Sequence, residues 1–404
     1  SPYGTSSLVT MESFNKVGSA VYYGKEMPVL ELNLNSGADG AERPLYKDDM
    51  VVTGSVFGNQ AAEMNIEQTK FSGVYEISDS SSIDFGLQLT KMDNRYVSSN
   101  VQLDNWGGFT QPGELSAVIE RSSMQGQFDQ LGGSNDPRQQ TEYFTTSLEE
   151  IIAVAEASYT ARGAEYAQVG DCGTGYCAST DWTVDKRTTE ETKAAYIQFN
   201  HSSYINDLPM NLQFGVRYEE TDITSAALAP TYDAVYWLGG NEFTMLEATD
   251  AEGNAIQAFD DYSGEYSIVL PSIDFDVEII ENLVLRASYS TTVTRPSFTD
   301  IQGGITVDGT SFKNTGGFAG GGNPGLVPIE SDNIDLSVEW YYGDASYVSV
   351  GYFEKDVANF IGSSTREGVT LFNLNWPLGG DLYNQAVADS GIDPLKYTEV
   401  GAYI

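Results

Sequence analysis

Strict alternation of apolar and polar residues runs through several segments of the chain. In residues 212–219 every second side chain is apolar, and the positions between them are charged, polar or Gly. Successive side chains of a β-strand point to opposite faces, so this pattern predicts a strand with one apolar and one polar face. Residues 83–89, 273–279 and 334–340 repeat the pattern. About ten strands of this kind are predicted, which makes the chain all-β.

The apolar face of these strands has two alternative environments. In a soluble β-sandwich it forms the core, whereas in a membrane β-barrel it meets lipid while the polar face lines the lumen. The polar positions of the strands include several charged residues, namely Arg217, Glu219, Arg286 and Glu339. Aromatic residues lie near strand ends, where a barrel has its interfacial girdle: Tyr218, Tyr289 and Trp340. Both features favour an antiparallel transmembrane β-barrel.

Long polar stretches separate the strand-rich blocks, at residues 102–185, 226–261 and 303–324. Structureless loops longer than about 15 residues are uncommon in compact domains, but the extracellular loops of outer-membrane barrels are long. Short helices are expected outside the strands. Ser147 and Glu150 have capping-box spacing before an apolar stripe that ends ahead of Gly163, and a second helix is predicted near residues 381–388.

The composition supports the all-β prediction and narrows the choice of partners. The chain has 41 Gly and 25 Tyr against 20 Lys plus Arg, which suits aromatic strands joined by Gly-rich turns. Its formal net charge of -38 argues against DNA or RNA as partners, because nucleic-acid binding relies on Lys and Arg to neutralise phosphates. We interpret the acidity as solubility and self-repulsion, with surface binding of divalent cations left open. No apolar run approaches the roughly 18 residues of a spanning helix.

The two cysteines, Cys172 and Cys177, lie close together in a Gly-containing segment that can turn tightly. This spacing predicts a small loop disulfide, which in turn indicates an oxidising compartment such as a periplasm or cell surface. A metal pair is the alternative. His201 is the only other soft ligand in the sequence, however, and a structural zinc usually needs four ligands.

The sequence offers no convincing catalytic, cofactor or metal site. With one histidine there is no argument for a Ser-His pair, and the Gly-rich residues 316–322 lack the Lys and Ser or Thr of a phosphate loop. The acidic residues 48–49 and 250–254 do not match a calcium-loop spacing. Several loop aromatics either stack on sugar rings or pack the loops: Trp106, Phe109, Tyr176, Trp182 and Trp237. We therefore expect no enzyme, and the ligand-binding residues are unknown.

Residues 266–361 contain four landmarks in a fixed order. They are Leu-Pro-Ser at 270–272 followed by Arg-Pro at 295–296, a Gly-Asn-Pro turn at 322–324, a strand ending in Glu-Trp-Tyr at 339–341, and Tyr-Phe with Lys and Asp at 352–356. This set resembles the C-terminal barrel region of TonB-dependent outer-membrane receptors. Physically, Asn323 and Pro324 initiate a turn, and the Arg295 guanidinium either pairs with a lumen carboxylate or faces water.

The resemblance implies a receptor of the cell outer membrane that takes up a scarce solute, such as a carbohydrate or siderophore. Its implied partners are outer-membrane lipid, an unknown solute, and the TonB system, which it would contact through a plug. No plug-like segment is found in the sequence, and the strands are too few for a barrel of roughly 22 strands. Residues 1–404, which no linker or repeat divides, are thus expected to form one incomplete barrel region.

Two alternatives belong to other classes of protein. One is a receptor-derived β-fragment, located outside the cell, whose exposed strand edges pair with copies of itself into a structural assembly. The other is a soluble β-sandwich lectin, which fits the alternation but not the four landmarks.

Overall fold

The computed structural model describes residues 1–13, 16–34, 45–105, 107–239, 242–253, 255–307, 311–313, 316–374 and 376–404. Antiparallel strands make up most of these residues and the helices are few and short, so the all-β prediction is confirmed. No helix in this part of the chain is long and apolar enough to cross a membrane.

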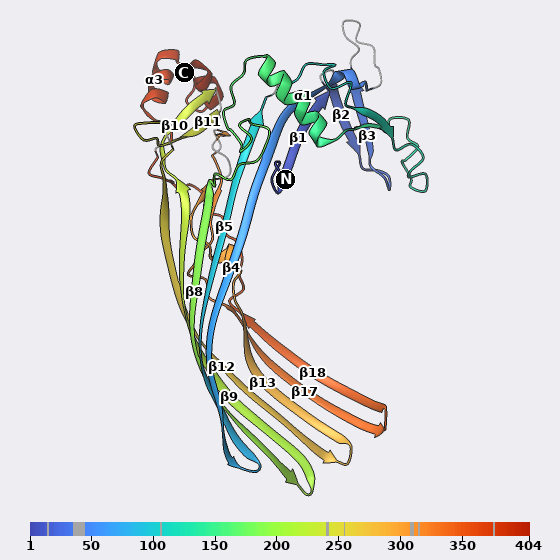
Figure 1. Ribbon diagram of the computed structural model, residues 1–404, viewed down its shortest axis with the longest axis vertical. Coiled ribbons are helices and arrows are strands. Elements are labelled where there is room, and N and C mark those ends of the chain that lie inside the picture. Colours follow the sequence, from blue (N-terminus) through green and yellow to red (C-terminus); the bar gives the residue numbers. More distant parts are fainter. Residues whose placement is uncertain are drawn as a thin grey trace. The chain divides into compact units, whose positions relative to one another are not determined.

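The main sheet contains nine strands of the described residues, and their order in the sheet follows the sequence (Figure 1). They are β1 (Ser6–Ser13), β4 (Met50–Ser78), β5 (Ser81–Asp104), β8 (Val184–Ile205), β9 (Leu208–Pro230), β12 (Gln257–Ile280), β13 (Leu283–Thr294), β17 (Ile329–Gly343) and β18 (Ser346–Ala358). The four predicted strands at 83–89, 212–219, 273–279 and 334–340 lie within β5, β9, β12 and β17.

Short and long connections alternate between these strands. Asn206 and Asp207, which join β8 to β9, have φ angles of 49° and 66°. Positive φ at both central residues is typical of the two-residue hairpin turn whose twist matches that of the strands. The other short turns are residues 79–80, 281–282 and 344–345, and the long connections are residues 14–49, 105–183, 231–256 and 295–328.

Two compact units can be distinguished, and each is described by itself. The first consists of residues 1–61 and 97–183, and the second of residues 62–96 and 184–404. Both β4 and β5 contribute residues to each unit. Because each unit is assembled from separated stretches of sequence, no single linker marks a boundary.

The first unit is organised around α1 (Leu148–Ala161), the helix predicted from its capping box. The Ser147 hydroxyl accepts a hydrogen bond from the Glu150 backbone N–H at 3.2 Å, which confirms the predicted start. The buried face of α1, with Ile151 and Ile152, packs into one core with Tyr176. The same unit also contains β2 (Lys16–Tyr22), β3 (Val29–Leu34), η1 (Lys47–Asp49), β6 (Glu120–Ser123) and β7 (Glu142–Thr145).

Beyond its share of the main sheet, the second unit contains short elements in its long connections and after β18. They are β10 (Tyr232–Gly239), β11 (Glu242–Glu247), α2 (Phe298–Ile301), β14 (Thr306–Val307), β15 (Ser311–Lys313), β16 (Ala319–Gly320), α3 (Asp381–Ser390) and α4 (Tyr397–Tyr403). The helix predicted near residues 381–388 is confirmed as α3. The predicted loop at 226–261 was too wide, because β9 runs to Pro230 and β12 begins at Gln257.

The two faces of the main sheet in the second unit differ sharply in polarity. Across four neighbouring strands Phe214 pairs with Ile273, Ile273 with Tyr289, and Tyr289 with Ile334, so their side chains form one row. We call this side the apolar face. No second sheet of the described residues covers it, and Phe214 and Ile334 remain 47% and 41% exposed. A soluble sandwich would bury this face as its core.

Candidate functional site

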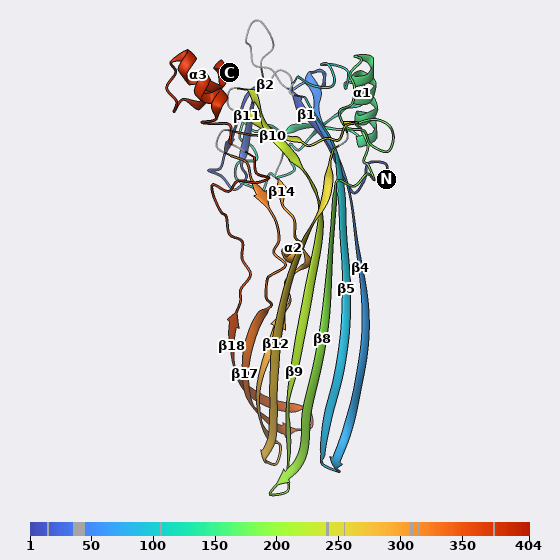
Figure 2. The same cartoon turned by 90° about the vertical axis from the view of Figure 1, so that its left-hand side faces the viewer.

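The opposite, polar face of the same sheet is partly covered by the connection between β13 and β17. The covering residues are 295–304 and 322–326, which we call the docked segment. Figure 2 shows its helix α2 beside β12. Two backbone hydrogen bonds hold its two parts together, from Gly322 N–H to the Gln302 carbonyl and from Asn323 N–H to the Asp300 carbonyl.

Local sequence explains why the chain turns back at this point. Pro296 ends β13, because its ring fixes φ and removes a backbone donor. Ser297 then caps α2: its hydroxyl accepts from Asp300 N–H, and the Asp300 carboxylate accepts from Ser297 N–H, both at 3.2 Å. This reciprocal capping box satisfies two backbone donors at the start of the helix.

Apolar side chains fix the docked segment on the polar face. Ile301 is fully buried and packs against Ile223 of β9 and Ile268 of β12. Phe298 and Leu326 pack around the same cluster. Burying one such aliphatic side chain stabilises a fold by about 2–3 kcal/mol, so the segment is firmly attached.

Glycines allow the docked segment to approach the sheet at backbone distance. A Cβ atom on Gly264 of β12 would lie 2.1 Å from the Pro324 carbonyl oxygen. A Cβ on Gly304, whose φ is +98°, would lie 2.4 Å from the Ala227 Cβ. Between these points the Gly303 N–H donates to the Ser225 hydroxyl at 2.8 Å. Any larger residue at Gly264 or Gly304 would push the segment away.

A buried carboxylate joins the docked segment to the sheet. Glu219 of β9 accepts from Arg217 Nε at 2.6 Å and from Arg295 Nη2 at 2.9 Å. Its side chain is only 9% exposed, so both guanidinium groups stabilise a charge that water hardly reaches. Of the two alternatives for Arg295, the structure therefore selects pairing with a carboxylate.

A second group of charges lies further along the polar face, on β12, β13 and β17. Arg286 Nε contacts Glu339 Oε1 at 3.3 Å, and its Nη1 lies 3.8 Å from Asp276 Oδ1. The Tyr341 hydroxyl donates to Glu339 at 2.7 Å. Arg286 is half exposed, so this group contributes less stability than the one at Glu219.

Three further polar residues of this face were not singled out in the sequence. Glu190, Thr192 and Thr221 are buried, and the two threonine hydroxyls lie 2.9 Å apart. The alternation that identifies β9 at residues 212–219 continues through Thr221. Beyond residue 219, however, the positions on the side of the apolar face are charged. Continuing the two-residue period past the apolar run would have placed Thr221 on the polar face, whereas Glu190 and Thr192 lie on the neighbouring strand β8.

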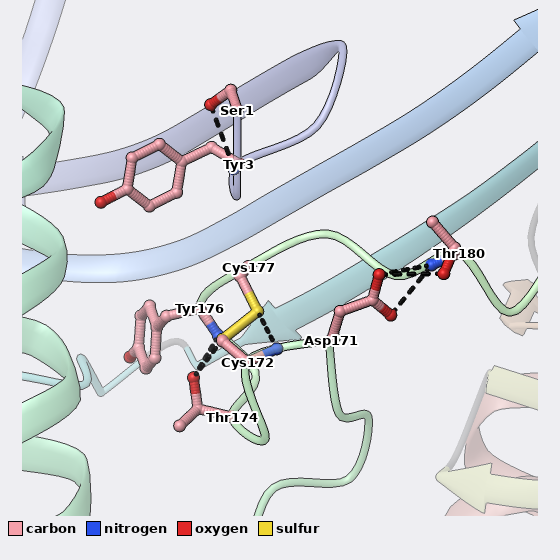
Figure 3. Close-up of a disulfide and its surroundings, with 8 residues drawn as sticks. All are labelled: Ser1, Tyr3, Asp171, Cys172, Thr174, Tyr176, Cys177 and Thr180. Carbon is pink, nitrogen blue, oxygen red and sulfur yellow. Dashed lines mark hydrogen bonds between the residues drawn. A yellow bond between two sulfur atoms is a disulfide. The ribbon is translucent and has the colours of Figure 1, made fainter.

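The predicted disulfide between Cys172 and Cys177 is present in the first unit (Figure 3). Next to it, both carboxylate oxygens of Asp171 accept from Thr180, through the backbone N–H and the hydroxyl. These hydrogen bonds from Thr180 lower the pKa of Asp171 below its ordinary value. The disulfide and this clamp together fix the ends of a short loop.

The remaining candidates from the sequence are placed as follows. Phe109 and Tyr176 are buried and pack against each other in the core of the first unit, so their role there is structural. Trp237 packs on Phe243, whereas Trp106 lies outside the described residues, as does residue 254 of the acidic stretch 250–254. The Ser81 hydroxyl lies 2.8 Å from His201 Nδ1. No cluster of three or more metal-ligating side chains occurs among the described residues.

Comparison with known proteins identifies one matching family. The family model described as "TonB dependent receptor-like, beta-barrel" matches residues 21–386. No curated protein matches the chain.

Solved structures with some similarity to the chain include three bacterial receptors. A mutant of the ferric enterobactin receptor PfeA from Pseudomonas aeruginosa, in complex with enterobactin, is 11% identical with a TM-score of 0.23, over 87% of this chain and 53% of that chain. A double mutant of the hemophore receptor HasR from Serratia marcescens, in complex with the hemophore HasA and heme, is 13% identical with a TM-score of 0.27, over 88% of this chain and 54% of that chain. The siderophore receptor PirA from Pseudomonas aeruginosa is 10% identical with a TM-score of 0.21, over 87% of this chain and 55% of that chain. The chain spans about half the length of these receptors.

Proposed function

The chain belongs to the TonB-dependent receptor family, to the β-barrel part of such receptors, and from this premise we propose that it serves an outer-membrane receptor for the TonB-dependent uptake of a scarce solute. The family consists of receptors and transporters, so the chain is not an enzyme. The proposed solute is a carbohydrate, a siderophore or a similar nutrient. In this function the apolar face meets lipid, and the polar face lines the path of the solute.

The exposed apolar face is the observation that carries the proposal. On β9 the alternation with an apolar outward side spans residues 208–218, and a tilted strand needs about 9–11 residues to cross the hydrocarbon core. Tyr218 lies at one end of this run, and Trp340 lies near the end of β17 that leads into the short turn to β18; both are exposed, and an interfacial girdle of aromatic residues is expected at such ends. Beyond Tyr218 the outward positions become charged, starting with Glu220.

The experiment that tests the proposal compares uptake in paired bacterial strains. The intact receptor that contains this chain is produced in an outer-membrane host with and without a functional TonB, and uptake of radiolabelled oligosaccharides and ferric siderophores is measured. Uptake of one class that depends on both the receptor and TonB supports the function. Equal uptake in both strains for every solute, or a protein released from membranes by carbonate washing, would overturn it.

The self-associating extracellular fragment remains a prediction. It requires the strand edges of separate molecules to pair, which analytical ultracentrifugation of the detergent-free protein would detect as large assemblies.

A further inference from the structure

Two buried carboxylates lie on the polar face of the second unit, and they differ in their partners. Glu219 on β9 accepts from both Arg217 and Arg295, at 2.6 and 2.9 Å. Glu190 on the neighbouring strand β8 is only 3% exposed, yet its Oε1 atom has no hydrogen-bond partner among the described residues. A buried carboxylate oxygen without a donor is costly, because water cannot solvate its charge. One acid thus has two guanidinium partners, while the other has an unsatisfied oxygen.

Tyr266 of β12 supplies a second unsatisfied oxygen close to Glu190. Its hydroxyl is buried and also has no hydrogen-bond partner within the described part of the chain. Tyr266 pairs with Thr221 on β9, two residues from Ile223, which in turn pairs with Glu190. Both oxygens can accept hydrogen bonds, and a guanidinium group carries five N–H donors in a planar fork. We call Glu190 and Tyr266 the second seat, because together they suit such a group.

Arg295 is the side chain placed to occupy the second seat. Its positive charge acts on both Glu190 and Tyr266, so its guanidinium group lies within electrostatic reach of them. Its contact with Glu219 uses Nη2, and its side chain makes no other hydrogen bond to the described residues. If Arg295 moved to the second seat, Glu219 would keep Arg217 as a partner. Each of the two buried carboxylates would then have one guanidinium partner.

We propose that Arg295 has two positions, one on Glu219 and one on the second seat, and that exchange between them shifts the docked segment on the polar face. Arg295 is the first residue after β13, so a move of its side chain towards β8 draws the start of the docked segment further across the sheet. The inference rests on the proposed function only in that the polar face lines the path of the solute. Exchange between the two positions would change how much of that path the docked segment covers.

Hydrogen exchange of the intact receptor in detergent tests the two positions, through peptides that contain the Gly303 and Asn323 amides. In Glu219→Gln we expect exchange to rise less than about threefold, because Arg295 takes the second seat. Glu190→Gln alone should not speed exchange, because Arg295 then stays on Glu219. The double variant leaves Arg295 without a carboxylate, so exchange should be about tenfold faster or more, as in Arg295→Gln.

Glu191→Gln is the matched control, because its exposed side chain lies next to Glu190 in sequence but on the opposite side of β8. It should not speed exchange, either alone or combined with Glu219→Gln. Circular dichroism of each variant shows whether the fold is retained. Tyr266→Phe combined with Glu219→Gln is a milder test, since it removes one acceptor of the second seat and keeps both the ring and Glu190. It should give exchange between those of Glu219→Gln and the double variant.

The second seat would be overturned if Glu219→Gln alone speeded exchange as much as Arg295→Gln. It would also be overturned if Glu190→Gln or Tyr266→Phe added nothing in the Glu219→Gln background, or if Glu191→Gln had the same effect as Glu190→Gln. These results are independent of solute transport. TonB-dependent uptake together with such a result would leave the proposed function standing and remove the second seat. The expected exchange pattern without TonB-dependent uptake would do the reverse.

Discussion

Arg295 donates a hydrogen bond to Glu219 at 2.9 Å, although 76 residues separate them in the sequence. Glu219 belongs to β9, and Arg295 is the first residue after β13. The contact therefore fixes where the connection after β13 begins to cross the polar face. It also explains why an Arg-Pro pair suits this position, because the proline ends the strand while the arginine anchors the segment that follows.

Replacing Arg295 should weaken the attachment of the docked segment to β9 but leave Glu219 with one guanidinium partner. In Arg295→Gln the Glu219 carboxylate keeps Arg217 as a partner, so we expect a loss of about 2 kcal/mol in the free energy of unfolding, typical of one hydrogen bond between charged groups. Urea unfolding followed by tryptophan fluorescence measures it. The control is Arg286→Gln on the same face, whose half-exposed pair should cost less than about 1 kcal/mol. Equal losses in the two variants would contradict a special role for Arg295.

Gly264→Ala should detach the docked segment from β12. The added methyl would lie 2.1 Å from the Pro324 carbonyl oxygen. This oxygen belongs to the backbone, so it cannot rotate away as a flexible side chain could. We expect faster hydrogen exchange at the Gly303 and Asn323 amides and faster proteolysis after residue 304. Gly351→Ala in β18 is the control, because its new methyl would find only the Leu336 carbonyl, at 3.7 Å. Unchanged exchange in Gly264→Ala would show that the segment does not rely on this close approach.

The disulfide should stabilise the first unit by a modest amount. Closing a loop of this size lowers the entropy of the unfolded chain, which stabilises the folded state by about 2 kcal/mol. The double variant Cys172→Ser with Cys177→Ser should lose about that much, as measured by thermal unfolding, while the wild type with reductant should behave like the variant. Mass spectrometry after alkylation reports whether the two thiols are bonded. Free thiols in protein isolated from cells would contradict an oxidising compartment.

Asp136 makes stability depend on pH at the acidic end. The hydrogen bond from Arg138 lowers its pKa from 3.8 to about 2. Because the folded-state pKa is lower than the unfolded one, the stabilisation is complete above about pH 4 and is lost as the pH falls towards 2. Asp136→Asn should therefore lower the melting temperature at pH 6 but have little effect at pH 2. A constant difference between variant and wild type across this range would exclude the titration of Asp136 as the cause.

The sequence predicts the strands well where apolar and polar residues contrast. Residues 212–219 lie on β9 with Arg217 and Glu219 on one face, as expected. The same rule fails further along β9, where Ala226 and Ala227 give no contrast between faces although the strand continues to Pro230. Contacts such as Arg295 with Glu219 could not be assigned, because a two-residue period gives the face of a side chain but not its partner on another strand. The approach of Gly133 to the Met27 carbonyl likewise joins distant segments through the backbone, which no local pattern reports.

The polarity of the two faces gives the sharpest test of the membrane barrel. Leu336 lies on the apolar face of β17, opposite Ala287, and the adjacent Asp335 lies on the polar face, opposite Ser288. An arginine on the lipid side of a barrel strand costs about 2–4 kcal/mol near the middle of the bilayer, whereas the lumen side contacts water. Leu336→Arg should therefore reduce the amount of receptor assembled in the outer membrane, and Asp335→Arg should leave it nearly unchanged. Heat-modifiable migration in gels distinguishes folded barrel from unfolded chain in both variants. If both arginines were tolerated equally, the apolar face would not be in contact with lipid, and the proposed uptake function would lose the observation on which it rests.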